Sequence, residues 1–282
     1  MAEAHPGKLV LVATPIGNLG DISPRAVQVL GDADVVACED TRRTGRLLVS
    51  AGVRAKRLVA VHEHNERGQA EALVQRMLAG DVVALVTDAG TPAISDPGER
   101  VVAAAAEAGL VIEIVPGPSA VIAALAVSGL PTERFCFDGF LPRKGRLRAE
   151  RIAAIAGEAR TTVLYEAPHR VAATVADLAL ACGDGRRIAL ARELTKRFEE
   201  VWRGTLAEAV AHTVEVEARG EYVLVVEGAP LVEATEADLD AALQAQLNAG
   251  ADKRTAIATV AGQLRLPRRQ VYQAALRLAP GR

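Results

Sequence analysis

Between residues 86 and 98 the chain reads Val-Thr-Asp-Ala-Gly-Thr-Pro-Ala-Ile-Ser-Asp-Pro-Gly. The short β-branched run at residues 81–86 predicts a buried strand, and the Ala-rich residues 99–108 predict a helix. The loop between them holds more turn-forming residues than a strand-to-helix connection needs. Ligands of an open parallel sheet bind beyond the carboxyl ends of its strands, so this loop predicts part of a binding site. The alternative is an Asx-rich surface turn.

The same arrangement recurs through the first half of the chain. Apolar runs predict strands at residues 9–13, 34–38, 58–61 and 111–115, and polar or glycine-bearing loops follow at 14–21, 39–44, 62–66 and 116–119. Ser23 and Pro24 suit the N-cap and first turn of a helix, and residues 120–128 predict another helix. Gly17 and Gly20 do not fit the G-x-G-x-x-G spacing of dinucleotide-binding loops. Strands that alternate with helices predict a mostly parallel sheet covered on both faces.

A second α/β unit is predicted after residue 131. Its expected strands are 135–137, 162–165, 187–191 and 222–226, and a run with five basic residues and one acid occupies 143–151. From residue 231 onward the sequence predicts helices at 235–247, 253–264 and 268–278, and residues 250–282 hold seven Lys or Arg against one Asp. Two short basic helices joined by a tight turn are typical of a helix-turn-helix-like appendage. The expected domains are therefore 1–120, 121–230 and 231–282.

Composition narrows the class of protein. The chain has 282 residues, 50% of them hydrophobic, and a net charge of −2, so any contact with nucleic acid must come from local basic patches. Its three cysteines form no C-x-x-C pair, which is typical of a reducing compartment. No apolar run approaches the roughly 20 residues of a membrane span, and residues 1–7 lack the segments of a signal peptide. We expect a soluble cytoplasmic protein without a membrane partner.

Two polar clusters admit more than one interpretation. In Glu-Asp-Thr-Arg-Arg at residues 39–43, the guanidinium groups of Arg42 and Arg43 suit a phosphate while a carboxylate positions a hydroxyl. The alternative is an ion-pair network that supports a helix start. His62 and His64 suit a metal ion only with a third ligand, and none has a convincing spacing, so we expect no metal site. Hydrogen bonding to substrate or capping of the loop remain open for these histidines.

Two further loops are ambiguous in the same way. Glu-Ala-Pro-His-Arg at residues 166–170 offers an acid, an imidazole and a guanidinium at a strand end, and His suits proton transfer near neutral pH. It is also a good helix start, with Pro168 in the first turn. Pro-Gly-Pro-Ser at residues 116–119 is either a rigid turn or a backbone cradle for a ligand.

The joint order of the motifs is more specific than any one of them. In sequence they are TPIGN (14–18), EDTR (39–42), HEHN (62–65), DAGTP (88–92), SDPG (95–98), PGPS (116–119), FLP (140–142), YEAPHR (165–170) and ARELTK (191–196). Over residues 8–230 the chain closely resembles the bacterial ribosomal RNA ribose 2'-O-methyltransferases of the tetrapyrrole-methylase superfamily. The basic tail resembles an extension that many members carry.

The resemblance implies two α/β domains with a cleft between them for S-adenosylmethionine, a small helical C-terminal tail, and a homodimer. Gly90 lets the backbone approach a ligand closely, and a carboxylate at Asp88 attracts a positively charged sulfonium or amine. Carried over from the family, the expected cofactor neighbours are Pro15, Asp88, Gly90, Thr91, Ile94, Ser95, Ser119, Ala120, Leu164, Leu194 and Gly228.

The implied reaction is methyl transfer to a cytidine ribose 2'-hydroxyl in the decoding region of 16S rRNA, with free rRNA or the small ribosomal subunit as substrate. A ribose hydroxyl must be positioned and its proton accepted. The expected base is Glu166 or His169, with Lys196 stabilising the alkoxide. The expected substrate-binding residues are Asp40, Arg42, Arg43, His62, Asn65, Arg143 and Lys144.

Two other classes of function remain open at this point. A tetrapyrrole or diphthamide methylase would use the same cofactor cleft, but it needs neither the basic tail nor the EDTR loop. A non-catalytic RNA-binding factor would need no cofactor cleft.

Overall fold

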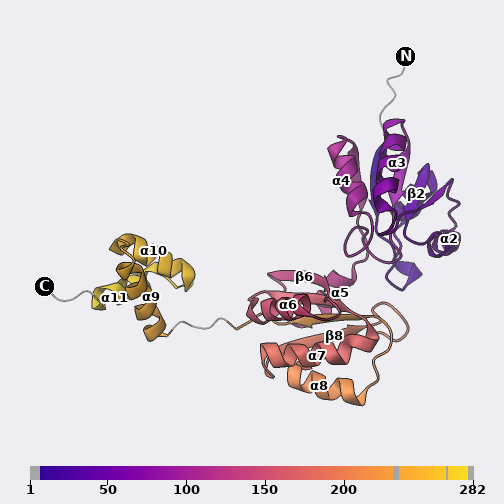
Figure 1. Ribbon diagram of the computed structural model, residues 1–282. Helices are drawn as coiled ribbons and strands as arrows, with labels where there is room; N and C mark the ends of the chain where they lie inside the picture. The colour runs from indigo at the N-terminus through magenta and orange to yellow at the C-terminus, as the bar shows by residue number, and fades with distance from the viewer. Residues whose placement is uncertain (1–6, 231–234, 265, 279–282) are drawn as a thin grey trace. The chain divides into compact units, whose positions relative to one another are not determined.

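The computed structural model describes residues 7–230, 235–264 and 266–278. The chain divides into two compact units, Met1–Ala229 and Pro230–Arg282 (Figure 1). The first unit contains two five-stranded sheets and the second contains helices. None of the helices in these described ranges is long and apolar enough to cross a membrane.

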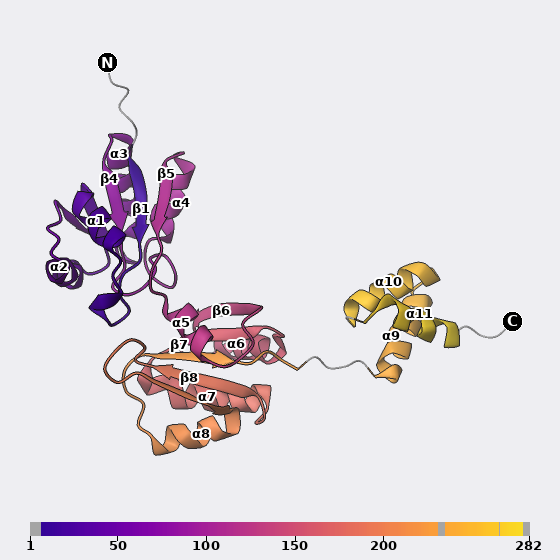
Figure 2. The same ribbon diagram turned by 180° about the vertical axis from the view of Figure 1, so that it is seen from behind.

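The first sheet is entirely parallel, in the strand order β3-β2-β4-β1-β5. Its strands are β1 (Lys8–Val12), β2 (Val35–Cys38), β3 (Leu58–Ala60), β4 (Val82–Leu85) and β5 (Val111–Val115). Its helices are η1 (Leu19–Asp21), α1 (Pro24–Asp32), α2 (Thr41–Ser50), α3 (Glu66–Leu78) and α4 (Glu99–Glu107). Apolar side chains of α3 and α4 cover one face of the sheet and those of α1 and α2 cover the other (Figure 2). The predicted parallel α/β arrangement is confirmed.

Local capping explains where these helices begin. The Ser23 hydroxyl accepts a hydrogen bond from the Ala26 N–H at 3.1 Å, and Pro24 opens α1. The Asp40 carboxylate accepts from the Arg42 N–H at 2.8 Å and starts α2 directly after β2. As a result the EDTR loop is held at the carboxyl edge of the first sheet.

The second sheet is mixed, in the order β6-β7-β10-β8-β9. Its strands are β6 (Phe135–Phe140), β7 (Thr161–Glu166), β8 (Arg187–Arg192), β9 (Glu200–Thr205) and β10 (Tyr222–Val226). Only the β6–β7 pair is parallel, whereas β10 runs antiparallel to both of its neighbours, as does β9 to β8. On one face lie α6 (Arg146–Gly157), α7 (Pro168–Cys182) and α8 (Leu206–Glu215), and on the other lies α5 (Ala120–Val127).

In the second unit, the described residues 235–264 and 266–278 form three helices that share an apolar core. Its helices are α9 (Glu236–Asn248), α10 (Lys253–Gln263) and α11 (Arg268–Arg277). Thr235 forms a capping box with Asp238 at the start of α9, and Asp252 caps α10. The predicted helices are confirmed to within a residue or two.

Candidate active site

A cavity of about 330 Å³ lies where loops at the carboxyl edge of the first sheet meet the second sheet. The 86–98 loop supplies a large part of its wall. The expected cofactor neighbours that line it are Gly90, Thr91, Ile94, Ser95, Ser119, Ala120 and Leu194. The structure therefore brings together seven of the eleven residues expected there.

Backbone pairing ties the 86–98 loop to the end of β1. The Thr14 N–H donates to the Gly90 carbonyl at 2.9 Å, and the Gly90 N–H donates to the Thr14 carbonyl at 3.1 Å. The Thr14 hydroxyl also donates to the Thr87 carbonyl at 3.1 Å. Gly90 has a φ of 87°, and a Cβ there would lie 3.4 Å from Ile16 Cγ2. Glycine therefore permits both the left-handed backbone and the close approach of the two loops.

Backbone strain is concentrated in two loops that line this cavity. Among the described residues, four non-glycines have a positive φ: Ala93 (67°), Ser95 (58°), Glu193 (48°) and Thr195 (65°). Two lie in the 86–98 loop and two in the loop between β8 and β9. Such conformations cost free energy and cluster at binding and catalytic sites.

Apolar and aromatic groups form the wall from the second sheet. Phe140 and Tyr165 both line the cavity, with ring centroids 5.4 Å apart. Burial raises the pKa of the Tyr165 hydroxyl to about 12, so this side chain stays neutral. Gly139, with a φ of 61°, lies so close to the Ser95 hydroxyl that a Cβ there would be 3.0 Å away. Strand β6 and the 86–98 loop are therefore in direct contact beside the cavity.

Lys196 lies in the cavity wall within a small charge cluster. Its ammonium group contacts Glu193 Oε1 at 2.8 Å and Glu221 Oε2 at 2.9 Å. Burial opposes the charged form, but the bonds to the two carboxylates outweigh it and raise the pKa of Lys196. Its alkyl chain crosses Gly17, where a Cβ would lie 2.4 Å from Lys196 Cγ. Only glycine leaves room for the lysine here.

Asp96 is a titratable cavity residue for which the sequence predicted no role. It belongs to the SDPG motif and lines the cavity half-buried. Burial raises the pKa of its carboxyl to about 6, and the charges of Glu39 and Asp88 act in the same direction. The feature of the sequence that could have indicated a role for Asp96 is its position in the 86–98 loop. A carboxyl group that lies in a cleft and has a pKa near neutral pH is a candidate for proton transfer.

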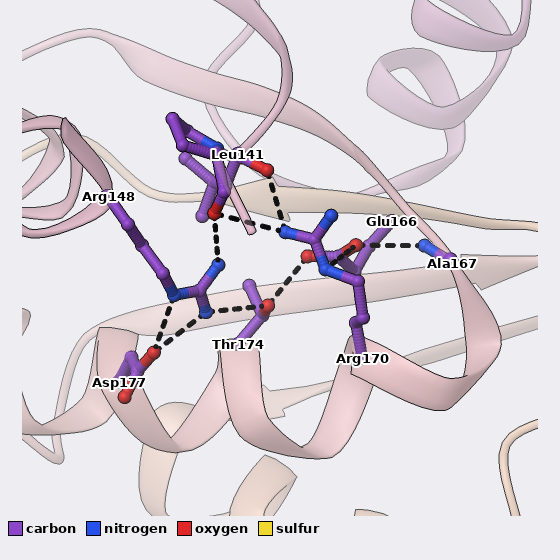
Figure 3. Close-up of polar contacts among 8 residues, drawn as sticks. Leu141, Arg148, Glu166, Ala167, Arg170, Thr174 and Asp177 are labelled. Atoms are coloured by element: carbon purple, nitrogen blue, oxygen red, sulfur yellow. Dashed lines mark hydrogen bonds and ion pairs between the residues drawn. The ribbon is translucent and has the colours of Figure 1, made fainter. Parts of the chain in front are cut away.

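The Glu166 carboxylate, by contrast, is enclosed in a structural network (Figure 3). It is fully buried, accepts from the Thr174 hydroxyl at 2.6 Å and from the Ala167 N–H at 2.9 Å, and pairs with Arg170 Nε at 3.1 Å. Arg170 in turn donates to the Leu141 carbonyl at 2.7 Å. The carboxylate holds the 140–142 turn through Arg170, which argues against its expected role as base.

Glu166 does belong to the lining of the first cavity, as does Lys196, whereas four other expected residues lie outside that lining. His169 is exposed on the first turn of α7, Leu164 is fully buried in the core, and Pro15 adjoins the lining residue Ile16 without lining the cavity itself. Gly228 packs against the backbone of Ala159, because β10 runs antiparallel and its carboxyl end lies away from the cleft. Tyr222 and Val223, at the amino end of β10, line the cavity instead.

A second, polar cavity of about 590 Å³ lies at the ends of β2, β3 and β4. Its lining includes four expected substrate-binding residues, Asp40, Arg42, Arg43 and His62, together with Glu39 and the expected cofactor neighbour Asp88. Asp88 therefore lies here, paired with Arg43 at 3.0 Å, and not in the lining of the first cavity. Burial raises the pKa of Glu39, whereas hydrogen bonds from Arg42 lower the pKa of Asp40. In the described ranges no three His, Cys, Asp or Glu side chains are arranged to hold a metal ion.

The remaining expected substrate residues lie outside both cavities. The Asn65 side chain braces its own loop, donating to the Ala60 carbonyl at 3.0 Å and accepting from the His62 N–H at 2.9 Å. Arg143 and Lys144 are both exposed in the turn between β6 and α6.

The comparisons with known proteins agree with this geometry. The family model described as Tetrapyrrole (Corrin/Porphyrin) Methylases matches residues 8–210. The chain belongs to the tetrapyrrole methylase family.

Similar proteins within this family share one name. The chain is 46% identical to "Ribosomal RNA small subunit methyltransferase I" of Synechocystis sp., covering 96% of this chain and 98% of that protein. It is 50% identical to the protein of the same name from Xylella fastidiosa, covering 84% and 85%. Among solved tetrapyrrole methylases, the methyltransferase CobJ matches with a TM-score of 0.61 at 21% identity, covering 79% of this chain and 95% of that one. Uroporphyrin-III C-methyltransferase from Thermus thermophilus, complexed with S-adenyl homocysteine, matches with a TM-score of 0.56 at 20% identity, covering 78% and 97%.

Tetrapyrrole methylases use S-adenosylmethionine, and the first cavity fits it. Its volume lies within the range of small-molecule sites, its walls include Ile16, Leu194 and Val223, and the carboxylates of Asp96 and Glu221 offer negative charge to a cationic ligand. This protein is an S-adenosylmethionine-dependent methyltransferase.

Proposed function

We propose that the protein methylates the ribose 2'-hydroxyl of a cytidine in the decoding region of 16S rRNA. The observation that supports this most strongly is the pair of adjoining cavities. One has the size and apolar walls for the cofactor, and the other is polar and bears guanidinium groups. The names of the similar proteins point to rRNA of the small subunit as substrate. We further propose that the protein acts in the cytoplasm as a homodimer.

The first cavity would hold the cofactor through a few recognisable contacts. Backbone groups around Gly90 and Ala120 would pair with its polar atoms, and Ile16 and Leu194 would pack against the adenine ring. The cofactor supplies an electrophilic methyl group. Because Lys196 is flanked by two carboxylates, its cluster carries net negative charge. We therefore assign Lys196 to ordering Glu193 and Glu221 around the cationic cofactor, in place of the alkoxide role expected from the sequence.

Asp96 is the proposed proton acceptor. It lines the cofactor cavity, and its pKa responds to Glu39 and Asp88 of the second cavity, so it lies where the two cavities adjoin. A ribose between a base in the second cavity and a methyl group in the first would present its hydroxyl there. Asp96 would take the hydroxyl proton as the oxygen attacks, and its pKa of about 6 leaves it ionised at neutral pH.

Basic side chains outside the cavities would contact the rRNA backbone. Arg42 is 88% exposed at the rim of the second cavity, and Lys144 is exposed beside β6. In the second unit, Lys253, Arg254, Arg268 and Arg269 are exposed at the starts of α10 and α11. Phosphate contacts of this kind supply affinity that weakens with salt.

Transfer of radiolabelled methyl groups tests the proposal. Small subunits purified from cells that lack this protein would be incubated with labelled S-adenosylmethionine and the full chain, then separated into rRNA and protein. We expect label in the 16S rRNA. Label on a tetrapyrrole or on ribosomal protein, with none on rRNA, would contradict the proposal and favour another branch of the family.

A further inference from the structure

We propose that the second cavity binds the cytosine base of the target nucleotide, and that Asp88 distinguishes cytosine from uracil. This inference rests on the proposed function, and it assigns the selection of the base to a carboxylate oxygen of Asp88.

Two polar atoms in this cavity lack partners. Asp88 Oδ2 accepts from Arg43 Nη1 at 3.0 Å, but Asp88 Oδ1 is buried and has no hydrogen-bond partner among the described residues. His62 Nδ1 is buried and unpartnered in the same way. Both residues line the cavity. Buried polar groups are almost always hydrogen-bonded, so these two atoms point to a ligand that supplies the missing partners.

The chemistry of the two atoms fits the hydrogen-bonding edge of cytosine. A carboxylate oxygen only accepts hydrogen bonds, whereas an imidazole nitrogen donates when protonated. Cytosine presents an exocyclic amino donor beside acceptors, and carboxylates recognise that amino group. Asp88 Oδ1 would accept from the amino group, and His62 Nδ1 would donate to a ring acceptor. Uracil carries a carbonyl in place of the amino group and would meet Asp88 with repulsion.

The surroundings favour a base over a phosphate at this place. Glu39, Asp40 and Asp88 contribute three carboxylates, against the guanidinium groups of Arg42 and Arg43. An anion inside the cavity would be repelled, while Arg42 at the exposed rim remains open to the backbone phosphate. The charge of Asp88 also reaches Asp96 in the cofactor cavity. Asp88 also directly precedes Ala89, which lines the cofactor cavity, so a base held at Asp88 lies next to that cavity.

The Asp88→Asn variant tests the assignment. The Arg43 guanidinium would keep the amide oxygen facing it, so the amide NH₂ would take the place of Oδ1 and offer a donor. Small subunits would be reconstituted with 16S rRNA that carries either C or U at the modified position. We expect the C-to-U ratio of kcat/KM to fall by about tenfold or more in the variant. Glu63→Gln, an exposed change of the same charge in the His62 loop, should keep the wild-type ratio.

A second measurement uses only the wild-type protein. A target nucleotide with pyrimidin-2-one, which lacks the amino group, should be methylated about tenfold more slowly than cytidine. Equal rates, or an unchanged ratio in Asp88→Asn, would overturn the assignment of Asp88 and leave the proposed function intact. Absence of methyl transfer to the cytidine substrate by the wild type would instead overturn the proposed function itself.

Discussion

Asp96 is the residue on which the proposed chemistry depends. Replacing it with asparagine removes the proton acceptor but keeps the size of the side chain, so we expect kcat to fall by about 100-fold or more. Cofactor affinity, measured by calorimetry, should fall by much less than kcat, because Glu221 still offers negative charge to the cofactor. The wild-type rate should rise with pH and level off above about 6, where the carboxyl is ionised, and this inflection should be absent from the residual rate of Asp96→Asn. Glu99→Gln, an exposed change three residues away, should keep the wild-type profile.

The same substitution should affect stability with a defined dependence on pH. The folded carboxyl of Asp96 has a pKa of about 6, above the ordinary value of 3.8 that it regains on unfolding. Below about pH 4 the carboxyl is protonated in both states and does not affect stability. Between about pH 4 and pH 6 it ionises in the unfolded state first, so the free energy of unfolding falls, and the loss is complete above about pH 6. At pH 8 we expect the free energy of unfolding of Asp96→Asn to exceed that of the wild type by about 1 kcal/mol. This is less than the full pKa shift would give, because solvent screens a half-buried carboxylate. If Asp96→Asn changed the free energy of unfolding by the same amount at pH 4 and at pH 8, the environment described for Asp96 would be contradicted.

Glu166 should behave as a structural residue. Glu166→Ala leaves Arg170 and Thr174 without their buried partner, and breaking such a pair costs about 3 kcal/mol. Thermal unfolding should show the loss. Glu150→Ala is the matched control, because it breaks an exposed Arg–Glu pair at 2.7 Å and should cost less than about 1 kcal/mol. A stable Glu166→Ala protein that has lost activity would restore this residue as a candidate base.

At the scale of the elements, the loop between β8 and β9 stores backbone strain beside the cofactor cavity. Thr195 is β-branched and has a φ of 65°, a conformation that asparagine adopts more easily. We expect Thr195→Asn to raise the free energy of unfolding by about 1 kcal/mol, as measured by denaturant titration. Thr213→Asn, within α8, relieves no such strain and should not stabilise the protein.

The strands also show which parts of the fold could be predicted from the sequence. Strands β2 and β4 are continuous apolar runs, and β1 and β5 are apolar apart from Lys8 and Glu113. Turn residues follow each strand, and this pattern predicted both the positions of the strands and the parallel sheet. Strand β9 was not predicted, because Glu200–Thr205 has no continuous apolar run, contains no buried residue and ends in a glycine-threonine pair. The direction of β10 cannot be inferred from its own residues, because it depends on which neighbours it pairs with. The expectation that Gly228 lies at the cofactor came from the family resemblance, and the antiparallel pairing of β10 leaves this residue away from the first cavity.

The candidate site was predictable to a similar depth. Backbone-lined positions such as Gly90 and Ser119 follow from loops at strand ends. The roles of Glu166 and Asp96 required side-chain geometry, since a buried carboxylate in an ion pair and a half-buried carboxylate that lines a cavity look alike in sequence.

At the scale of the whole molecule, the second unit has its own core and should be dispensable for cofactor binding. A chain ending at Ala229 should bind S-adenosylmethionine as the full chain does, yet bind 16S rRNA more weakly. If Lys253, Arg254, Arg268 and Arg269 each meet a phosphate, the slope of log affinity against log salt should become shallower by about 3. Fluorescence anisotropy at several salt concentrations measures this slope, and an unchanged slope would exclude the second unit from the RNA interface.

The most direct test of the account is the identity of the methylated nucleoside. Small-subunit rRNA methylated by the full chain would be digested to nucleosides and analysed by mass spectrometry against synthetic standards. We expect 2'-O-methylcytidine, with the added mass on the ribose fragment. A methyl group on the base fragment, or on a nucleoside other than cytidine, would contradict it.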